Sequence, residues 1–170
     1  EGLKSTLTRS CEKIQEIAVR IPGRVKEQLF IDRYCDYVAQ KSENKDVYIL
    51  IPCIDWNIPI FQRPHQIAVS LTRRPNAQVF FVSDEYRYDN FAGCCPIEPQ
   101  LDLISWRVLP KLKEALGTAR HITVFMSWPR QAHLLEYIPY DQLVYEYIDD
   151  LSLFYYYTDA MKAKHYQLIQ

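Results

Sequence analysis

Glycine is scarce in this sequence, and the cofactor signatures that depend on glycine are missing. Only four of the 170 residues are glycine, and neither GxGxxG nor GxxxxGK followed by Ser or Thr occurs. The common dinucleotide-binding fingerprint and the phosphate-cradling P-loop are therefore excluded. CxxC and HExxH are missing as well, and the four histidines are scattered along the chain. We therefore expect no zinc ribbon, no thioredoxin-type redox site, no metal and no cofactor.

The sequence also lacks a strong charge of one sign and a long apolar run. Its 20 basic and 21 acidic side chains give a net charge of -1, whereas nucleic-acid binders usually present a clearly basic surface, so no nucleic-acid partner is expected. The apolar stretch Val47–Cys53 is far shorter than the roughly 20 residues that cross a bilayer. Residues 1–9 lack the apolar centre of a signal peptide. Five cysteines without paired spacing are typical of reduced thiols, which favours a cytoplasmic location.

Hydrophobic periodicity divides the chain into a helical start and an α/β remainder. Apolar residues at steps of three and four predict two amphipathic helices within residues 1–45, separated at Pro22-Gly23. Over residues 46–170, β-branched runs alternate with helical patterns, which predicts a Rossmann-like three-layer domain with a parallel sheet. Residues 83–99 are expected to form a long irregular connection. The expected strands include Val47–Ile51, Gln78–Val82, Leu101–Leu109, Ile122–Phe125 and Leu143–Tyr147, and the expected helices cover 63–72, 111–116, 131–137 and a final stretch capped by Asp150 or Ser152.

Three loops, residues 54–62, 127–130 and 148–151, should leave the same edge of this sheet, because parallel strands point the same way and ligands bind at their carboxyl ends. The loop 54–62 and the helix start that follows hold the densest group of candidate ligand-binding side chains. Trp56 is suited to stacking on a sugar, and Arg63 can grip a phosphate or carboxylate with two hydrogen bonds. Backbone N–H groups at the helix start would add attraction for an anion. The candidates in this segment are Asp55, Trp56, Gln62, Arg63 and His65.

A structural interpretation of the same segment has about equal support. Trp56 would then fill the core together with Phe61, Gln62 would cap the helix, and Arg63 would pair with an acid such as Asp55. Composition alone does not separate the two interpretations.

The other two loops carry further candidates. Adjacent Asp149 and Asp150 can act as a base, as hydrogen-bond acceptors or as metal ligands. Alternatively, Asp150 caps the last helix and Asp149 is simply solvated. Ser127 and Trp128 stand at the end of the fourth expected strand, where core and surface roles are as probable as ligand binding.

Two segments resemble motifs of bacterial glycosyltransferases of the GT-B fold. The first is Asp55-Trp56 followed by the run Phe61–Ala68 (FQRPHQIA), and the second is Val144–Phe154 (VYEYIDDLSLF). The resemblance covers residues 46–170 and leaves residues 1–45 as a helical appendage. It implies two Rossmann-like domains that face each other across a cleft. The amino-terminal domain, to which this chain is similar, mainly meets the acceptor, and a carboxy-terminal domain that this chain lacks holds the nucleotide-sugar donor.

The resemblance implies an enzyme of polysaccharide biosynthesis that moves a sugar from a nucleotide-sugar to a glycan or cell-surface acceptor. Asp149 or Asp150 would orient or deprotonate the acceptor hydroxyl, and this chain alone is expected to be inactive. A nucleotide-sugar, bound through the other domain, and a glycan acceptor are the implied partners, and peripheral membrane association of the full-length protein is left open. The alternative is a non-enzymatic, flavodoxin-like interaction or glycan-binding module.

Overall fold

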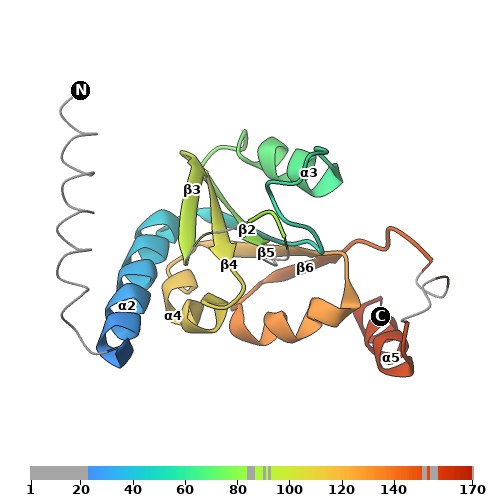
Figure 1. Cartoon of the computed structure of the whole chain (residues 1–170). Coiled ribbons are helices and arrows are strands. Elements are labelled where there is room, and N and C mark those ends of the chain that lie inside the picture. The colour runs from blue at the N-terminus through green and yellow to red at the C-terminus, as the bar shows by residue number, and fades with distance from the viewer. Residues whose placement is uncertain are drawn as a thin grey trace. The chain divides into compact units, whose positions relative to one another are not determined.

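The computed structural model (Figure 1) describes residues 23–83, 87–89, 91, 93–150, 153 and 157–169. The chain divides into two compact units, residues 1–33 and residues 34–170. The helix α2 (Gly23–Ser42) begins in the first unit and ends in the second. It confirms the second of the two expected helices, whereas the first lies outside the described residues.

A six-stranded sheet forms the middle of the second unit, in the order β3-β4-β2-β1-β5-β6. The strands from β4 to β6 run parallel to their neighbours, and β3 pairs antiparallel with β4 at one edge. The expected α/β fold is therefore confirmed, with a sheet that is mostly rather than wholly parallel. The strands are β1 (Asp46–Ile51), β2 (Ala77–Ser83), β3 (Cys94–Glu98), β4 (Leu101–Ser105), β5 (His121–Met126) and β6 (Gln142–Tyr145).

The central strand β1 is apolar on both faces, so both faces of the sheet must be covered. Val47, Ile49 and Ile51 belong to one apolar cluster, and Tyr48 and Leu50 belong to the other. Full burial of side chains of this kind contributes about 1.5–3 kcal/mol each. Figure 1 shows helices on both sides of the sheet, which gives three layers. The second cluster is covered by α3 (Arg63–Leu71), and the first is covered by the end of α2, η1 (Leu109–Lys111), α4 (Lys113–Leu116) and η2 (Pro129–Tyr137).

The irregular connection expected over residues 83–99 is wrong in its last part, where β3 forms. β3 is an edge strand whose composition hides it: Pro96 has no N–H to donate, and Ile97 and Glu98 are exposed, so the apolar alternation is weak. Gly93, just before it, has a φ of 73°, and a Cβ there would lie 2.0 Å from the Tyr34 ring. Glycine is therefore required at this entry to the edge strand.

Three other expected boundaries also differ from the structure. The strand expected to reach Leu109 ends at Ser105, and residues 109–111 form the 3-10 helix η1, with a proline in its first turn. The expected helix 131–137 is the 3-10 helix η2. The last helix, α5 (Asp159–Leu168), starts later than expected, because the Thr158 hydroxyl caps it by accepting the Met161 N–H at 3.3 Å. Asp150 is therefore not the cap of this helix, and Ser152, the other expected cap, lies outside the described residues.

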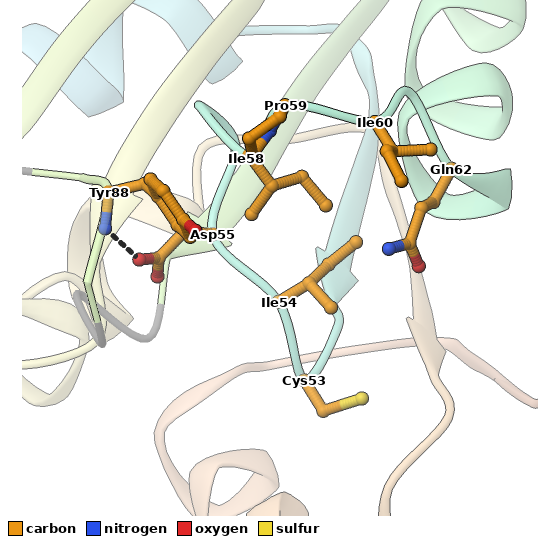
Figure 2. Close-up of a pocket in the computed structure, with 8 residues that line it drawn as sticks. All are labelled: Cys53, Ile54, Asp55, Ile58, Pro59, Ile60, Gln62 and Tyr88. Carbon is orange, nitrogen blue, oxygen red and sulfur yellow. Dashed lines mark hydrogen bonds between the residues drawn. The ribbon is translucent and has the colours of Figure 1, made fainter.

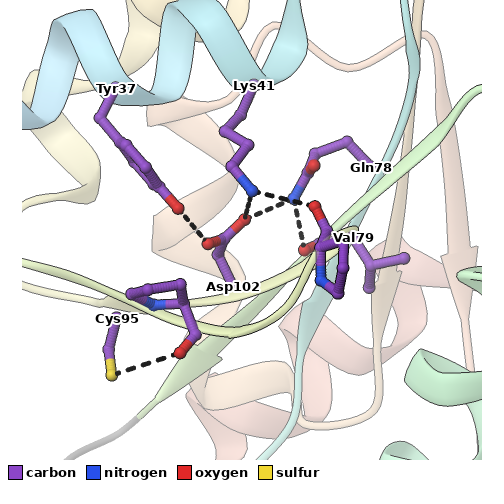
Figure 3. Close-up of polar contacts among 8 residues, drawn as sticks. Tyr37, Lys41, Gln78, Val79, Cys95 and Asp102 are labelled. Carbon is purple, nitrogen blue, oxygen red and sulfur yellow. Dashed lines mark hydrogen bonds and ion pairs between the residues drawn. The ribbon is translucent and has the colours of Figure 1, made fainter. Parts of the chain in front are cut away.

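A buried carboxylate anchors the end of α2 to the sheet, as Figure 3 shows. Asp102 of β4 is fully buried and accepts hydrogen bonds from the Tyr37 hydroxyl and from Gln78 Nε2, the latter at 2.6 Å. Lys41 Nζ lies 3.5 Å from the same carboxylate and donates to the Pro99 carbonyl at 2.9 Å. Burial and the neighbouring Asp102 raise the pKa of Tyr37, so its hydroxyl stays protonated and keeps donating. Gln78 and Asp102 lie near the amino ends of β2 and β4, and Tyr37 and Lys41 come from α2, so these contacts join the end of the helix to the sheet.

Candidate functional site

The strand order places a topological switch point between β1 and β5. The chain passes from β1 to β2 on one side and returns later to β5 on the other side of β1. In such sheets, ligands bind outside the carboxyl ends of the strands at this point. Because β1, β5 and β6 are parallel neighbours, the segments 52–62, 127–128 and 146–150 all leave the sheet at one edge. The shared edge that the sequence predicts is confirmed.

The loop after β1, residues 52–62 (hereafter the first loop), is held by Asp55. This side chain is only 2% exposed. One carboxylate oxygen, Oδ2, accepts the backbone N–H groups of Arg87 and Tyr88, each at 2.7 Å, and that of Asp89 at 3.3 Å. Asp55 thus fixes the loop that follows β2 against the first loop. Asp55 is a candidate ligand-binding residue in the sequence, and in the structure its carboxylate has a positioning role.

Asp89, in the loop that follows β2, accepts hydrogen bonds from the first loop. Its carboxylate accepts the Trp56 N–H at 2.7 Å, and the backbone and side-chain N–H groups of Asn57 at 2.9 and 2.8 Å. It also accepts the hydroxyl of Ser83, the last residue of β2, at 2.5 Å. Asp89 is buried, so these donors compensate the carboxylate for its lost solvation. Sequence reasoning missed Asp89, because only the fold brings it to a loop more than thirty residues away.

His65 has a structural role at the start of α3. Its Nδ1 accepts the Gln62 N–H at 3.1 Å, and its Nε2 lies 3.0 Å from the Trp56 carbonyl. The neutral ring with its proton on Nε2 satisfies both contacts. The side chain is 1% exposed and stacks on Phe81, with ring centroids 5.5 Å apart. His65 therefore orients the end of the first loop and does not reach a ligand directly.

Trp56 is half-buried among other rings. Its ring meets Phe81 nearly edge-on at a centroid distance of 5.0 Å, lies 5.0 Å from His65, and contacts the Phe61 ring at 6.4 Å. Phe61 itself is 55% exposed. Trp56 thus shares the core packing of the structural interpretation, whereas Phe61 stands at the surface instead of filling the core.

An ion pair connects the start of α3 with the loop that follows β6. Arg63 Nη2 lies 3.0 Å from Glu146 Oε1, and the Arg63 side chain is 66% exposed while that of Glu146 is 13% exposed. The Glu146 N–H also donates to the Met126 carbonyl at 2.8 Å, which ties it to the end of β5. The acid that pairs with Arg63 is therefore Glu146 and not Asp55. This contact joins the two segments whose motifs the sequence analysis singles out.

Gln131 lies at the switch point and was not a candidate from the sequence. Its Nε2 donates to the Pro52 carbonyl at 2.9 Å and so links η2 to the carboxyl end of β1. Its buried Oε1 has no hydrogen-bond partner among the described residues. Ser127 and Trp128 are half-buried next to it in sequence, and the Trp128 carbonyl accepts the Gln131 N–H. A glutamine at a helix start is too common a feature for sequence alone to flag.

A pocket of about 390 Å³ opens on the first loop (Figure 2). All but one of its lining residues come from that loop, and Tyr88 comes from the loop after β2. Figure 2 shows the Ile54 and Ile58 side chains between Tyr88 and Asp55 on one side and Ile60 and Gln62 on the other. The lining consists of Cys53, Ile54, Asp55, Ile58, Pro59, Ile60, Gln62 and Tyr88.

The pocket gathers only some of the predicted site residues. Asp55 and Gln62 line it, whereas the other candidates do not. Asp149 and Asp150 are exposed on the segment after β6, at the same edge of the sheet. This edge of the sheet therefore carries a pocket at the first loop and two exposed carboxylates in residues 146–150 (hereafter the third loop).

Among the described residues, no group of three or more His, Cys, Asp or Glu side chains is arranged to hold a metal ion. Within the same residues, no helix has both the length and the apolar character to cross a membrane.

Comparisons with protein families, curated proteins and solved structures found no match for this chain.

Proposed function

We propose that this chain is the acceptor-binding domain of a glycosyltransferase that moves a sugar from a nucleotide-sugar to a glycan or a related cell-surface acceptor. The observation that carries the proposal is the ion pair between Arg63 and Glu146 beside the pocket. It joins the two segments that resemble glycosyltransferase motifs, at the edge where sheets of this topology bind ligands. The type of reaction is inferred from the resemblance, and the fold supports the placement of both segments around one site.

In this proposal each loop has its own task. The pocket in the first loop holds the acceptor, and Asp149 or Asp150 orients the acceptor hydroxyl or takes its proton while the hydroxyl oxygen attacks the anomeric carbon. A second domain of the same gene product brings the nucleotide-sugar to this edge, and its nucleoside diphosphate leaves with the bonding electrons. Asp55 and Asp89 keep the pocket in shape and take no part in the chemistry.

The proposal is tested by comparing the product of the complete reading frame with the 170-residue chain. Both are incubated with a panel of radiolabelled nucleotide-sugars and glycan acceptors, and transfer is measured. We expect transfer by the complete product, and acceptor binding without transfer by the 170-residue chain. Acceptor binding by both proteins with no transfer from any donor would favour the interaction module instead.

Substitutions in the complete product separate the two carboxylates. A general base contributes about 10² to 10⁴ in rate, so Asp149→Asn or Asp150→Asn should lower kcat at least about 100-fold for whichever residue acts. Because Thr158 caps α5, Asp150→Asn does not remove the cap of that helix. Wild-type kcat in both variants, with unchanged unfolding temperatures, would remove both residues from the catalytic role.

A further inference from the structure

The pocket in the first loop is apolar where a site for a bare sugar would be polar. Ile54, Ile58, Pro59 and Ile60 make up half of the lining residues. The other four residues carry the polar side-chain groups, and one of these groups, the Asp55 carboxylate, already accepts three backbone N–H groups. A ligand that fills this pocket would therefore meet mainly methyl and methylene groups.

The charge of the lining does not favour an anionic ligand group. Among the described residues that line the pocket there is no lysine or arginine. Two arginines follow lining residues or precede them in the chain, and both have partners: Arg63 pairs with Glu146, and Arg87 lies over the Tyr88 ring, 5.4 Å from its centroid. A phosphate or carboxylate in the pocket would lose hydration and would lie beside the Asp55 carboxylate. These features favour an uncharged ligand group over an anion.

The apolar surface continues from the pocket to solvent. Ile60, which lines the pocket, is 70% exposed, and its neighbour Phe61 is 55% exposed. Trp56, the ring expected to stack on a sugar, instead has three ring neighbours within its own part of the fold. Ile60 thus forms an exposed apolar rim of the pocket, and Phe61 follows it in the chain with further exposed apolar surface.

We infer that the pocket binds an uncharged apolar group attached to the acceptor sugar, such as an alkyl chain or an aryl ring. This inference rests on the proposed function, because it names the class of acceptor. The volume of about 390 Å³ falls in the lower part of the range of about 300–1,000 Å³ that small-molecule sites occupy. The pocket therefore holds a short apolar group, while the sugar remains outside it near the carboxylates of the third loop.

Binding of a graded series of alkyl glucosides to the 170-residue chain tests the inference. Methyl, butyl, hexyl and octyl β-glucoside are titrated below their micelle concentrations, with phenyl β-glucoside as an aromatic arm, and Kd is measured by calorimetry. Burial of each additional methylene should tighten binding about fourfold, so octyl should bind roughly tenfold or more tightly than hexyl glucoside. Tighter binding of the phenyl than of the hexyl compound would assign the pocket to aryl groups.

Variants locate the effect at the pocket. Ile60→Ser removes an exposed apolar side chain from the rim and should weaken octyl glucoside binding about fivefold or more. Ile97→Ser, a matched change at a partly exposed isoleucine of the distant edge strand β3, should leave Kd unchanged. Equal effects of the two variants, or affinity that does not depend on chain length, would overturn the inference.

A detergent with an octyl chain and no sugar separates this inference from the proposed function. If it binds as tightly as octyl glucoside, the apolar class of the pocket stands and the acceptor role is contradicted. If methyl glucoside binds as tightly as octyl glucoside, the acceptor role stands and the apolar inference fails.

Discussion

Removal of the Asp89 carboxylate is the sharpest test of how the first loop is held. In Asp89→Ala, four hydrogen bonds are lost: two from Asn57, one from the Trp56 N–H and one from the Ser83 hydroxyl. Asn57 is exposed, so water replaces its lost contacts, whereas Ser83 is fully buried and the Trp56 N–H is partly buried. A hydrogen bond to a charged group contributes about 1.5–3 kcal/mol, and loss of these two should lower the free energy of unfolding by about 3–6 kcal/mol.

The loss would be measured by urea denaturation, followed by tryptophan fluorescence. A decrease of this size is a large share of the roughly 5–15 kcal/mol by which typical domains are stable. Asp89→Asn keeps one acceptor oxygen but places an NH₂ group against the donors, so its decrease should be smaller, about 1–3 kcal/mol. Asp36→Ala, at an exposed position of α2, is the control and should stay within about 0.5 kcal/mol. An Asp89→Ala variant as stable as this control would refute the reasoning.

Two further predictions concern an ion pair and a thiol. A double-mutant cycle of Arg63→Ala and Glu146→Gln should give a coupling free energy below about 1 kcal/mol, because the arginine is exposed. This coupling should shrink in high salt, and a coupling above about 2 kcal/mol would contradict the prediction. Burial raises the pKa of Cys94 from 9.0 to about 12, so at pH 8 iodoacetamide should label the exposed Cys53 well before Cys94, as read by mass spectrometry. Between pH 9 and 12 the unfolded chain loses the Cys94 proton while the folded chain keeps it, so the free energy of unfolding should fall as pH rises; a rise would contradict the assignment.

The strands of the parallel core could be predicted because a strand that is buried on both faces has a continuous apolar, β-branched sequence. The β-branched runs of β1, β2 and β5 lie in the middle of the sheet, where both faces are apolar. β3 could not be predicted in this way, because an edge strand needs neither two apolar faces nor a full set of N–H donors. The start of α5 at Thr158 was missed for another reason: several residues before it are equally good caps in sequence.

The edge at which the three candidate loops gather followed from topology, but the roles of the residues on those loops did not. Parallel strands alone put the three loops at one edge. The positioning roles of Asp55 and His65 arise from backbone donors and rings that meet only in the folded chain. The ion pair of Glu146 could not be predicted, although Glu146 lies in a segment that resembles a known motif. The adjacent carboxylates of Asp149 and Asp150 are the stronger chemical signal in that segment.

The most direct measurement of the central claim is sugar transfer by the complete gene product with the pocket open and blocked. Ile58→Trp places a bulky ring among the lining residues of the pocket, and Ile97→Trp makes the same change on the distant strand β3. The account predicts transfer of labelled sugar by the wild-type protein and by Ile97→Trp, and a loss of at least about tenfold in kcat/KM for the acceptor in Ile58→Trp. Absence of transfer by the wild-type protein across the donor panel, or equal transfer by the two variants when both remain folded, would contradict it.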